Sequence, residues 1–191
     1  RKGFIEEVYE AVEAIDTENP ELLCEELGDV LLQVVFHARI SAEDKEFDID
    51  DVCDGICKKL IYRHPHVFGD VKVKNSAEIL ENWDTLKKTE KHQTTAADEL
   101  DAVARSLPSL MRTKKVIKRA RKAVIMDKNP EAAIDGIKSA AASMENSGDR
   151  KKALEDLLFY TCAVLQSEGL DGEELLYSRC EEIINAEKQK N

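Results

Sequence analysis

The chain has 191 residues, of which 42% are hydrophobic and 5% aromatic, enough for one large domain or two small domains. Its 28 Lys and Arg against 39 Asp and Glu give a net charge of −11, the reverse of the balance typical of nucleic-acid-binding proteins. No run of about 18 apolar residues spans a membrane, and no signal peptide is recognisable. We therefore expect a cytoplasmic protein that has neither nucleic acid nor membrane as a partner.

Five cysteines, at positions 24, 53, 57, 162 and 180, fall mostly on apolar positions of predicted helices. We interpret them as reduced thiols in the core of a cytoplasmic protein. Cys53 and Cys57 are four residues apart and could share a metal, but no second pair accompanies them. Buried thiols are therefore the favoured interpretation.

Two predicted helices open the chain. The first covers residues 3–16 and has one apolar arc, with Glu7 and Glu10 at its edge. A turn follows, in which Asn19 is the predicted N-cap and Pro20 takes the first position of a helix that runs to about residue 43. This second helix is apolar nearly all round, so we expect it to be buried.

Four acidic residues on these helices follow one spacing rule. Glu7 and Glu10 are three residues apart, and so are Glu26 and Asp29. Residues three apart share a helix face, so two helices packed side by side can point all four carboxylates at one place. Carboxylates that close repel one another unless a hard divalent cation neutralises them.

A solvated face is the alternative interpretation for acids at helical spacing, and for most acidic runs it is correct. It suits Glu6 and Glu25, which lie towards the polar sides of their helices. It does not suit Glu26 and Asp29, which have apolar neighbours on both flanks and therefore need a partner.

A third helix is predicted to begin after Asp48, with cations near its end. Lys59 and Arg63 are four residues apart and could contact a phosphate together. They could equally be the solvated basic end of a helix, where they would suit the helix dipole. Spacing alone leaves the two interpretations even.

Pro65 should end this helix, and we expect residues 64–68 to form a rigid loop with Phe68 tucked inwards. A fourth helix is predicted over residues 76–92, with Trp83, the only tryptophan, on one side. Core packing is the default role for that ring, and stacking on a base is the alternative.

The polar, Ala-rich stretch from Thr94 to Asp98 is a predicted linker. Helical pattern resumes at about residues 99–125, is interrupted at Pro108, and carries a basic run that we expect to be solvated. The cations of this run are Lys114, Lys115, Lys118, Arg119, Arg121 and Lys122.

Residues 130–189 weakly repeat the opening design, with predicted helices over Glu131–Ser147 and Asp149–Glu168. The acids are gone from this copy. Ile-Asp-Gly-Ile-Lys at 134–138 replaces the first acidic motif, and only Asp156 remains of the second. One acid cannot hold a metal cluster, so we expect this half to be structural and to contribute to dimerisation.

E-E-x-x-E at 6–10 followed by E-x-x-D at 26–29 resembles the signature of the all-α nucleoside triphosphate pyrophosphohydrolases, and of the MazG family in particular. Further segments agree and extend the resemblance over most of residues 4–120: C-E-E-L-G-D-V-L-L-Q-V-V-F-H-A at 24–38, R-H-P-H-V-F-G-D at 63–70, N-W-D-T-L-K at 82–87 and S-L-P-S-L-M-R at 106–112.

The resemblance implies an all-α helical bundle with two tandem domains, assembled as a homodimer. Residues 1–95 would be the catalytic domain and residues 96–191 the degenerate copy. Because the first acid of the motif follows Arg1 by only five residues, we expect the catalytic domain to be truncated at its N-terminus.

The resemblance also implies Mg²⁺-dependent hydrolysis of nucleoside triphosphates to monophosphate and pyrophosphate, with Mn²⁺ as a substitute and a house-cleaning role in the nucleotide pool. The implied metal-binding and catalytic residues are Glu7, Glu10, Glu26 and Asp29. Glu6 and Glu25 would support them or act as a base. The implied substrate-binding residues are Lys59, Arg63, Trp83 and Lys87.

Two rival functions belong to other classes. The first is a catalytically inactive helical dimerisation scaffold whose acids are relics, and it predicts no stabilisation by metal. The second is a carboxylate-bridged metal oxidase, which the absence of a Glu-x-x-His pattern disfavours.

Overall fold

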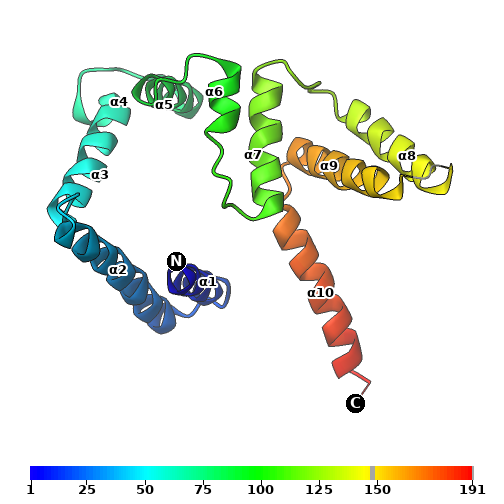
Figure 1. Ribbon diagram of the computed structural model, residues 1–191, viewed down its shortest axis with the longest axis horizontal. Coiled ribbons are helices and arrows are strands. Elements are labelled where there is room, and N and C mark those ends of the chain that lie inside the picture. The colour runs from blue at the N-terminus through cyan, green and yellow to red at the C-terminus, as the bar shows by residue number, and fades with distance from the viewer. Residues whose placement is uncertain (147–148, 191) are drawn as a thin grey trace. The chain divides into compact units, whose positions relative to one another are not determined.

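The computed structural model describes residues 1–146 and 149–190, and within these ranges every regular element is a helix (Figure 1). This confirms the all-α prediction. The chain divides into two compact units, residues 1–87 and residues 88–191. The helices are α1 (Lys2–Asp16), α2 (Pro20–Glu43), α3 (Ile49–Arg63), α4 (Pro65–Phe68), α5 (Ser76–Glu90), α6 (Ala96–Asp101), α7 (Ser109–Lys122), α8 (Pro130–Asn146), α9 (Arg150–Glu168) and α10 (Gly172–Lys188). None of these described helices is both long and apolar enough to cross a membrane.

The turn between α1 and α2 forms as its sequence predicts. The Asn19 side chain accepts a hydrogen bond of 3.1 Å from the backbone N–H of Leu22, and Pro20 occupies the first turn of α2. An N-cap oxygen satisfies an N–H that the helix itself leaves without an acceptor. The two helices therefore return on each other as a hairpin, with the two acidic motifs on neighbouring elements.

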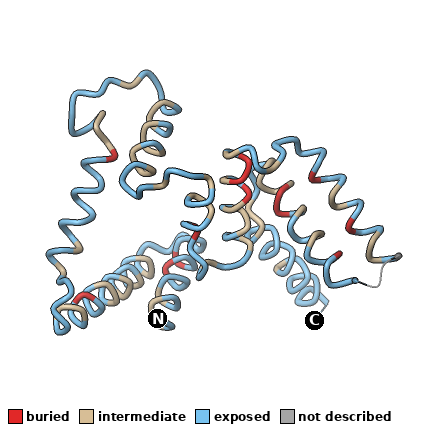
Figure 2. The backbone as a smooth tube through the Cα atoms, turned by 45° about the horizontal axis from the view of Figure 1, so that its top comes forward, coloured by how far each residue is buried: buried red, intermediate tan, exposed pale blue. Residues whose placement is uncertain are grey.

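The expectation that α2 is buried is wrong for the single chain. Leu27, Leu31 and Leu32 are 54%, 60% and 60% exposed, and Ala38 alone is buried among the 24 described residues of this helix (Figure 2). A helix that is apolar all round needs cover on several sides. In the first unit α1 is the helix that packs along it, so a broad apolar surface stays open.

The region around Pro65 also differs from its prediction. Pro65 begins the short helix α4 instead of starting a loop, because proline is well suited to the first turn of a helix. Phe68 ends this helix and is 61% exposed, so it is not tucked inwards.

Helix α3 begins at a capping box, in which the Asp48 side chain accepts hydrogen bonds from the backbone N–H groups of Asp50 and Asp51.

The linker predicted at residues 94–98 is partly helical. Thr95 and Asp98 form a capping box, which starts α6 at Ala96. Side-chain and then backbone hydrogen bonding with Thr95 also lowers the pKa of Asp98. The interruption at Pro108 is confirmed, since α7 begins at the next residue.

The core of the second unit lies where α7, α8 and α9 meet. Ile117, Ala133, Cys162 and Ala163 are buried there, and Ile117 is wholly inaccessible. Cys162 is thus a core thiol, as predicted, and burial raises its pKa. The other four cysteines, at positions 24, 53, 57 and 180, are free and exposed, so the prediction of core thiols is wrong for them.

The basic run on α7 is only partly solvated. Arg121 is buried and donates hydrogen bonds to the carbonyl of Asp127 and to Ser167 Oγ, at 3.1 and 2.8 Å. Lys114 pairs with Asp171 at 2.8 Å and lowers the pKa of that carboxyl. These contacts join α7 to α9, to α10 and to the loop after α7.

The end of α7 carries a backbone conformation that is costly for its residue. Val124 has φ of 59°, its N–H donates to the carbonyl of Arg121, and the N–H of Ile125 donates to the carbonyl of Ala120. This is the Schellman pattern, which normally places glycine at the left-handed position. A β-branched residue there is a genuine outlier. At the end of α9 the same left-handed position is filled by Gly169.

We expect Val124→Gly to stabilise the chain by about 0.5–1 kcal/mol. Removing the left-handed strain gains roughly 1–2 kcal/mol, and the added backbone freedom of glycine in the unfolded state costs roughly 0.5–1 kcal/mol. Val124 is 82% exposed, so little packing is lost. Urea unfolding would measure the change. Val124→Ala keeps Cβ and serves as the control, and an equal gain from alanine would contradict the strain explanation.

Candidate active site

Three carboxylates meet between α1 and α2. Glu7 on α1 and Glu26 and Asp29 on α2 are half-buried, and each offers an oxygen within 4.8 Å of the others. The hairpin brings this about, because its turn sets the two acidic motifs side by side and residues three apart share a face. Within residues 1–146 and 149–190 no other His, Cys, Asp and Glu side chains form such a group. We call these three residues the acid cluster.

Gln33 is a contact that the predicted set of site residues omits. Its Nε2 donates a hydrogen bond of 3.3 Å to Glu7 Oε1, across the two helices. The signal for it is spacing, because Gln33 lies one turn after Asp29 on the same stripe of α2. The amide thus holds one oxygen of Glu7 in place.

Glu10 lies beside the acid cluster and is exposed. Partial desolvation and then the negative charge of Glu7 raise the pKa of Glu10. Desolvation, followed by the charges of Glu10 and Asp29, likewise raises the pKa of Glu26. Glu10 and Glu26 are therefore both close enough to the other predicted acids to be affected by their charges, although Glu10 lies outside the closest group.

Glu6 and Glu25 are exposed neighbours of the cluster. The charge of Glu6 contributes to the raised pKa of Glu10, and that of Glu25 contributes to the raised pKa of Glu26. Both residues are close enough to act through their charge, and neither belongs to the three-carboxylate group.

The donor set of the acid cluster fits a hard divalent cation. Every member offers carboxylate oxygen, which suits Mg²⁺ and Mn²⁺, whereas zinc sites of proteins usually include thiolate or imidazole. After desolvation, the negative charges of neighbouring carboxylates contribute to the raised pKa values of Glu10 and Glu26. A cation of two positive charges would relieve that repulsion.

A second predicted group forms around the Trp83 ring. Arg63 Cζ lies 5.2 Å and Lys87 Nζ lies 4.6 Å from the centre of the ring, both within the range of cation–π attraction. Arg63 is only 5% exposed, while Trp83 and Lys87 are half-buried. Lys59 stands one turn before Arg63 on α3 and is exposed. The structure thus gathers three of the four predicted substrate-binding residues and leaves Lys59 at the edge.

The acid cluster and the Trp83 group occupy different parts of the first unit. The cluster lies in the first half of α2, and α3, which carries Arg63, begins only beyond the far end of α2 (Figure 1). At 1.5 Å per residue, about 20 Å of helix separate Asp29 from Glu43. In the single chain the acid cluster and the Trp83 group are therefore two separate sites.

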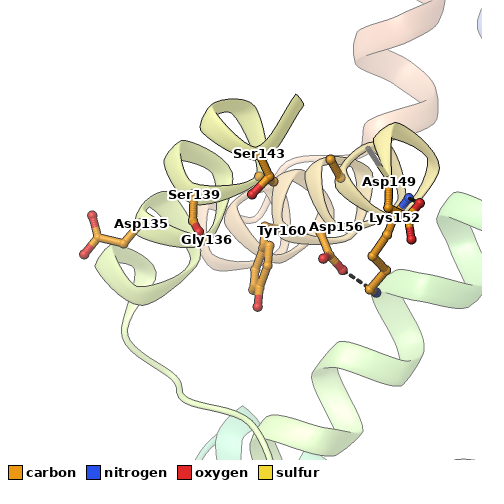
Figure 3. Close-up of a pocket in the computed structure, with 10 residues that line it drawn as sticks. Asp135, Gly136, Ser139, Ser143, Asp149, Lys152, Asp156 and Tyr160 are labelled. Atoms are coloured by element: carbon orange, nitrogen blue, oxygen red, sulfur yellow. Dashed lines mark hydrogen bonds and ion pairs between the residues drawn. The ribbon is translucent and has the colours of Figure 1, made fainter. Parts of the chain in front are cut away.

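The second hairpin, α8 with α9, shows what replaces the acids. Lys152 Nζ pairs with Asp156 Oδ1 at 2.6 Å, and this bond raises the pKa of the lysine (Figure 3). Tyr160 lies flat against Gly136, where a Cβ would come within 2.6 Å of the ring. An ammonium of the chain itself thus neutralises the one acid that remains. The predicted end of the α8 segment at Ser147 lies outside the described residues.

Comparison with known proteins identifies relatives. Residues 1–68 match the family model described as MazG nucleotide pyrophosphohydrolase domain. The chain is 36% identical over 177 residues to the nucleoside triphosphate pyrophosphohydrolase of Escherichia coli, an alignment that covers 88% of this chain and 67% of that protein. It is also 36% identical over 159 residues to the nucleoside triphosphate pyrophosphohydrolase/pyrophosphatase MazG of Thermotoga maritima, covering 82% and 60%.

A further relative is the uncharacterized protein YabN of Bacillus subtilis, which is 48% identical over 118 residues. That alignment covers 62% of this chain and 24% of YabN. The chain therefore spans between a quarter and two thirds of the length of these three relatives.

Proposed function

Since the chain belongs to the MazG family of nucleotide pyrophosphohydrolases, we propose that it hydrolyses nucleoside triphosphates between the α- and β-phosphates. The products would be a nucleoside monophosphate and pyrophosphate. The observation that carries this proposal is the acid cluster, in which Glu7, Glu26 and Asp29 converge within 4.8 Å. Such a constellation has little use in a structural helix pair, because its charges repel.

Mg²⁺ is the proposed cofactor, and Mn²⁺ would substitute for it. Glu7, Glu26 and Asp29 would hold the ion, with Glu10 joining them from the same face of α1. When bound, the ion would neutralise phosphate charge and lower the pKa of the attacking water. The chain's own contribution is to keep the carboxylates converged, with the Gln33 amide fixing Glu7. Glu6 and Glu25 would add negative charge around the site or act as a base.

The Trp83 group is the proposed substrate-binding surface. Lys59, Arg63 and Lys87 would bind phosphate oxygens through charge-assisted hydrogen bonds, and the Trp83 ring would pack against the nucleotide. In the single chain this group lies away from the acid cluster, at the other end of α2. We therefore include a homodimer in the proposal, supported by the open apolar surface of α2. The proposed cellular role is house-cleaning of the cytoplasmic nucleotide pool.

An inactive dimerisation scaffold is the second candidate, and the second hairpin favours it. There the Lys152–Asp156 pair has taken the place of an acid set, so a hairpin of this design persists without one. The two candidates differ in whether the first hairpin needs its acids for a reaction or tolerates them as remnants.

Pyrophosphate release would decide between them. The chain would be incubated with each of the four common nucleoside triphosphates and with Mg²⁺ or Mn²⁺, beside Glu7→Gln and the control Glu13→Gln, an exposed acid on the same helix. We expect metal-dependent release that falls at least 100-fold in Glu7→Gln, as removal of one electrostatic group from a site typically does, and stays unchanged in the control. No release from the unmodified chain with either ion would support the scaffold.

A further inference from the structure

Charge is distributed very unevenly along the chain. Residues 1–87 carry 10 Lys and Arg against 21 Asp and Glu, whereas residues 88–191 carry 18 of each. Within the second unit, residues 102–126 hold eight cations and no acid. The net charge of −11 thus belongs to the first unit, and a strongly basic segment stands in a unit that is neutral as a whole.

Four of these cations form a continuous exposed stripe on α7. They follow one another at intervals of three, three and four residues, which places them along one side of the helix over about 15 Å. The opposite side carries Ile117 and the buried guanidinium of Arg121, which pack into the second unit. The residues of this basic stripe are Arg112, Lys115, Lys118 and Lys122.

An apolar tip follows the stripe directly. Val124 and Ile125 are 82% and 60% exposed, and Lys128 just beyond them is exposed too. Packing does not explain Val124, because its side chain lies mainly in water and its backbone is strained. Strained residues persist most often where a function uses them. Packing within the chain therefore does not account for the apolar tip, and a binding partner would.

We propose that the basic stripe and the apolar tip bind a membrane surface rich in anionic phospholipids. Lys and Arg side chains are attracted to such a surface, and exposed aliphatic side chains gain by entering between the headgroups. The absence of a spanning helix among the described residues concerns crossing the bilayer, and peripheral binding of this kind needs no such helix.

Nucleic acid is the other polyanion to consider, and the segment suits it less well. Proteins that bind single strands stack bases on aromatic side chains, and residues 102–128 contain no Phe, Tyr or Trp. A phosphate backbone would use the basic stripe but would leave Val124 and Ile125 without a role. A lipid surface uses both features.

Cosedimentation with vesicles would test the proposal. The full chain would be mixed with vesicles of equal parts phosphatidylglycerol and phosphatidylcholine, or of phosphatidylcholine alone. We expect binding to the anionic vesicles only, and weakening at high salt. Each lysine near an anionic surface contributes about fivefold, so Lys115→Gln with Lys118→Gln should weaken binding about 25-fold. The matched control, Lys58→Gln with Lys151→Gln, neutralises two exposed lysines elsewhere and should change nothing.

The tip has its own test. Ile125→Ser and Val124→Gly should each weaken vesicle binding severalfold. Val124→Gly is expected to make the fold more stable, so a loss of binding there cannot be attributed to unfolding. Equal binding to both vesicle types, no binding to either, or stripe variants that bind as the parent does would each overturn the proposal. So would a single-stranded or duplex oligonucleotide that binds through the stripe while the vesicles do not.

Discussion

Glu26→Gln should make the metal-free chain more stable and at the same time abolish its response to Mg²⁺. Partial desolvation and the charges of Glu10 and Asp29 raise the pKa of Glu26, so the folded state opposes its ionisation. A neutral amide of the same shape removes that repulsion. It also replaces one of the three carboxylates of the acid cluster by an amide, whose single oxygen carries no negative charge. Metal binding should therefore be lost together with pyrophosphate release.

The pH dependence of this effect has a definite sign. A carboxyl whose pKa is higher in the folded than in the unfolded state binds more protons when folded. Its contribution to stability is therefore full below the unfolded pKa, near 4.5, and is lost as the pH rises through the raised folded pKa. The advantage of Glu26→Gln over the parent chain should accordingly be small near pH 4 and larger at pH 7.

Thermal unfolding followed by circular dichroism would measure both effects. The parent chain, Glu26→Gln and Glu13→Gln would be compared from pH 4 to 7.5, with and without Mg²⁺. A ligand at 100 times its Kd stabilises the folded state by about 2.7 kcal/mol, so saturating Mg²⁺ should raise the Tm of the parent and of Glu13→Gln. If Mg²⁺ raised the Tm of Glu26→Gln equally, the acid cluster would not be the metal site.

The sequence predicts the geometry of this site well because the relevant information is local. Helical spacing puts Glu26 and Asp29 on one face, and the Asn19 cap with Pro20 fixes where α2 begins. Because the turn is short, the two helices have few ways to pack, and Glu7 therefore lies close to Glu26 and Asp29. Gln33 follows from the same spacing, and only its partner had to come from the structure.

Burial is predicted less well because it depends on elements far away in the sequence. The apolar pattern of α2 shows that the helix needs cover, but it cannot show that the cover is missing from the single chain. The exposed Cys24 and Phe68 are misplaced for the same reason. Lys87 lies one turn after Trp83 on α5, so helical spacing relates that pair. Arg63 comes from α3, and no spacing rule relates that helix to α5.

A charge placed on the apolar surface of α2 should dissociate the proposed homodimer. Leu27 and Leu31 are one turn apart and more than half exposed, with Phe36 57% exposed further along the helix. Monomeric proteins rarely leave a contiguous apolar patch of this kind in water, and helices of this kind pair across dimer interfaces. Leu31→Lys should therefore convert the proposed homodimer into a monomer at micromolar concentration, because each interface would bury a charge without a partner.

Sedimentation velocity over a concentration series would follow the dissociation, with Gln189→Lys as a control that adds the same charge at an exposed polar position. We expect the dimer dissociation constant to rise at least 100-fold in Leu31→Lys and to stay unchanged in the control. A parent chain that is already monomeric would overturn the homodimer. If the partner completes the site, pyrophosphate release should fall with dimer content and recover as Leu31→Lys is concentrated. Full activity in the monomer would show instead that one chain brings its acid cluster and its cations to the same substrate.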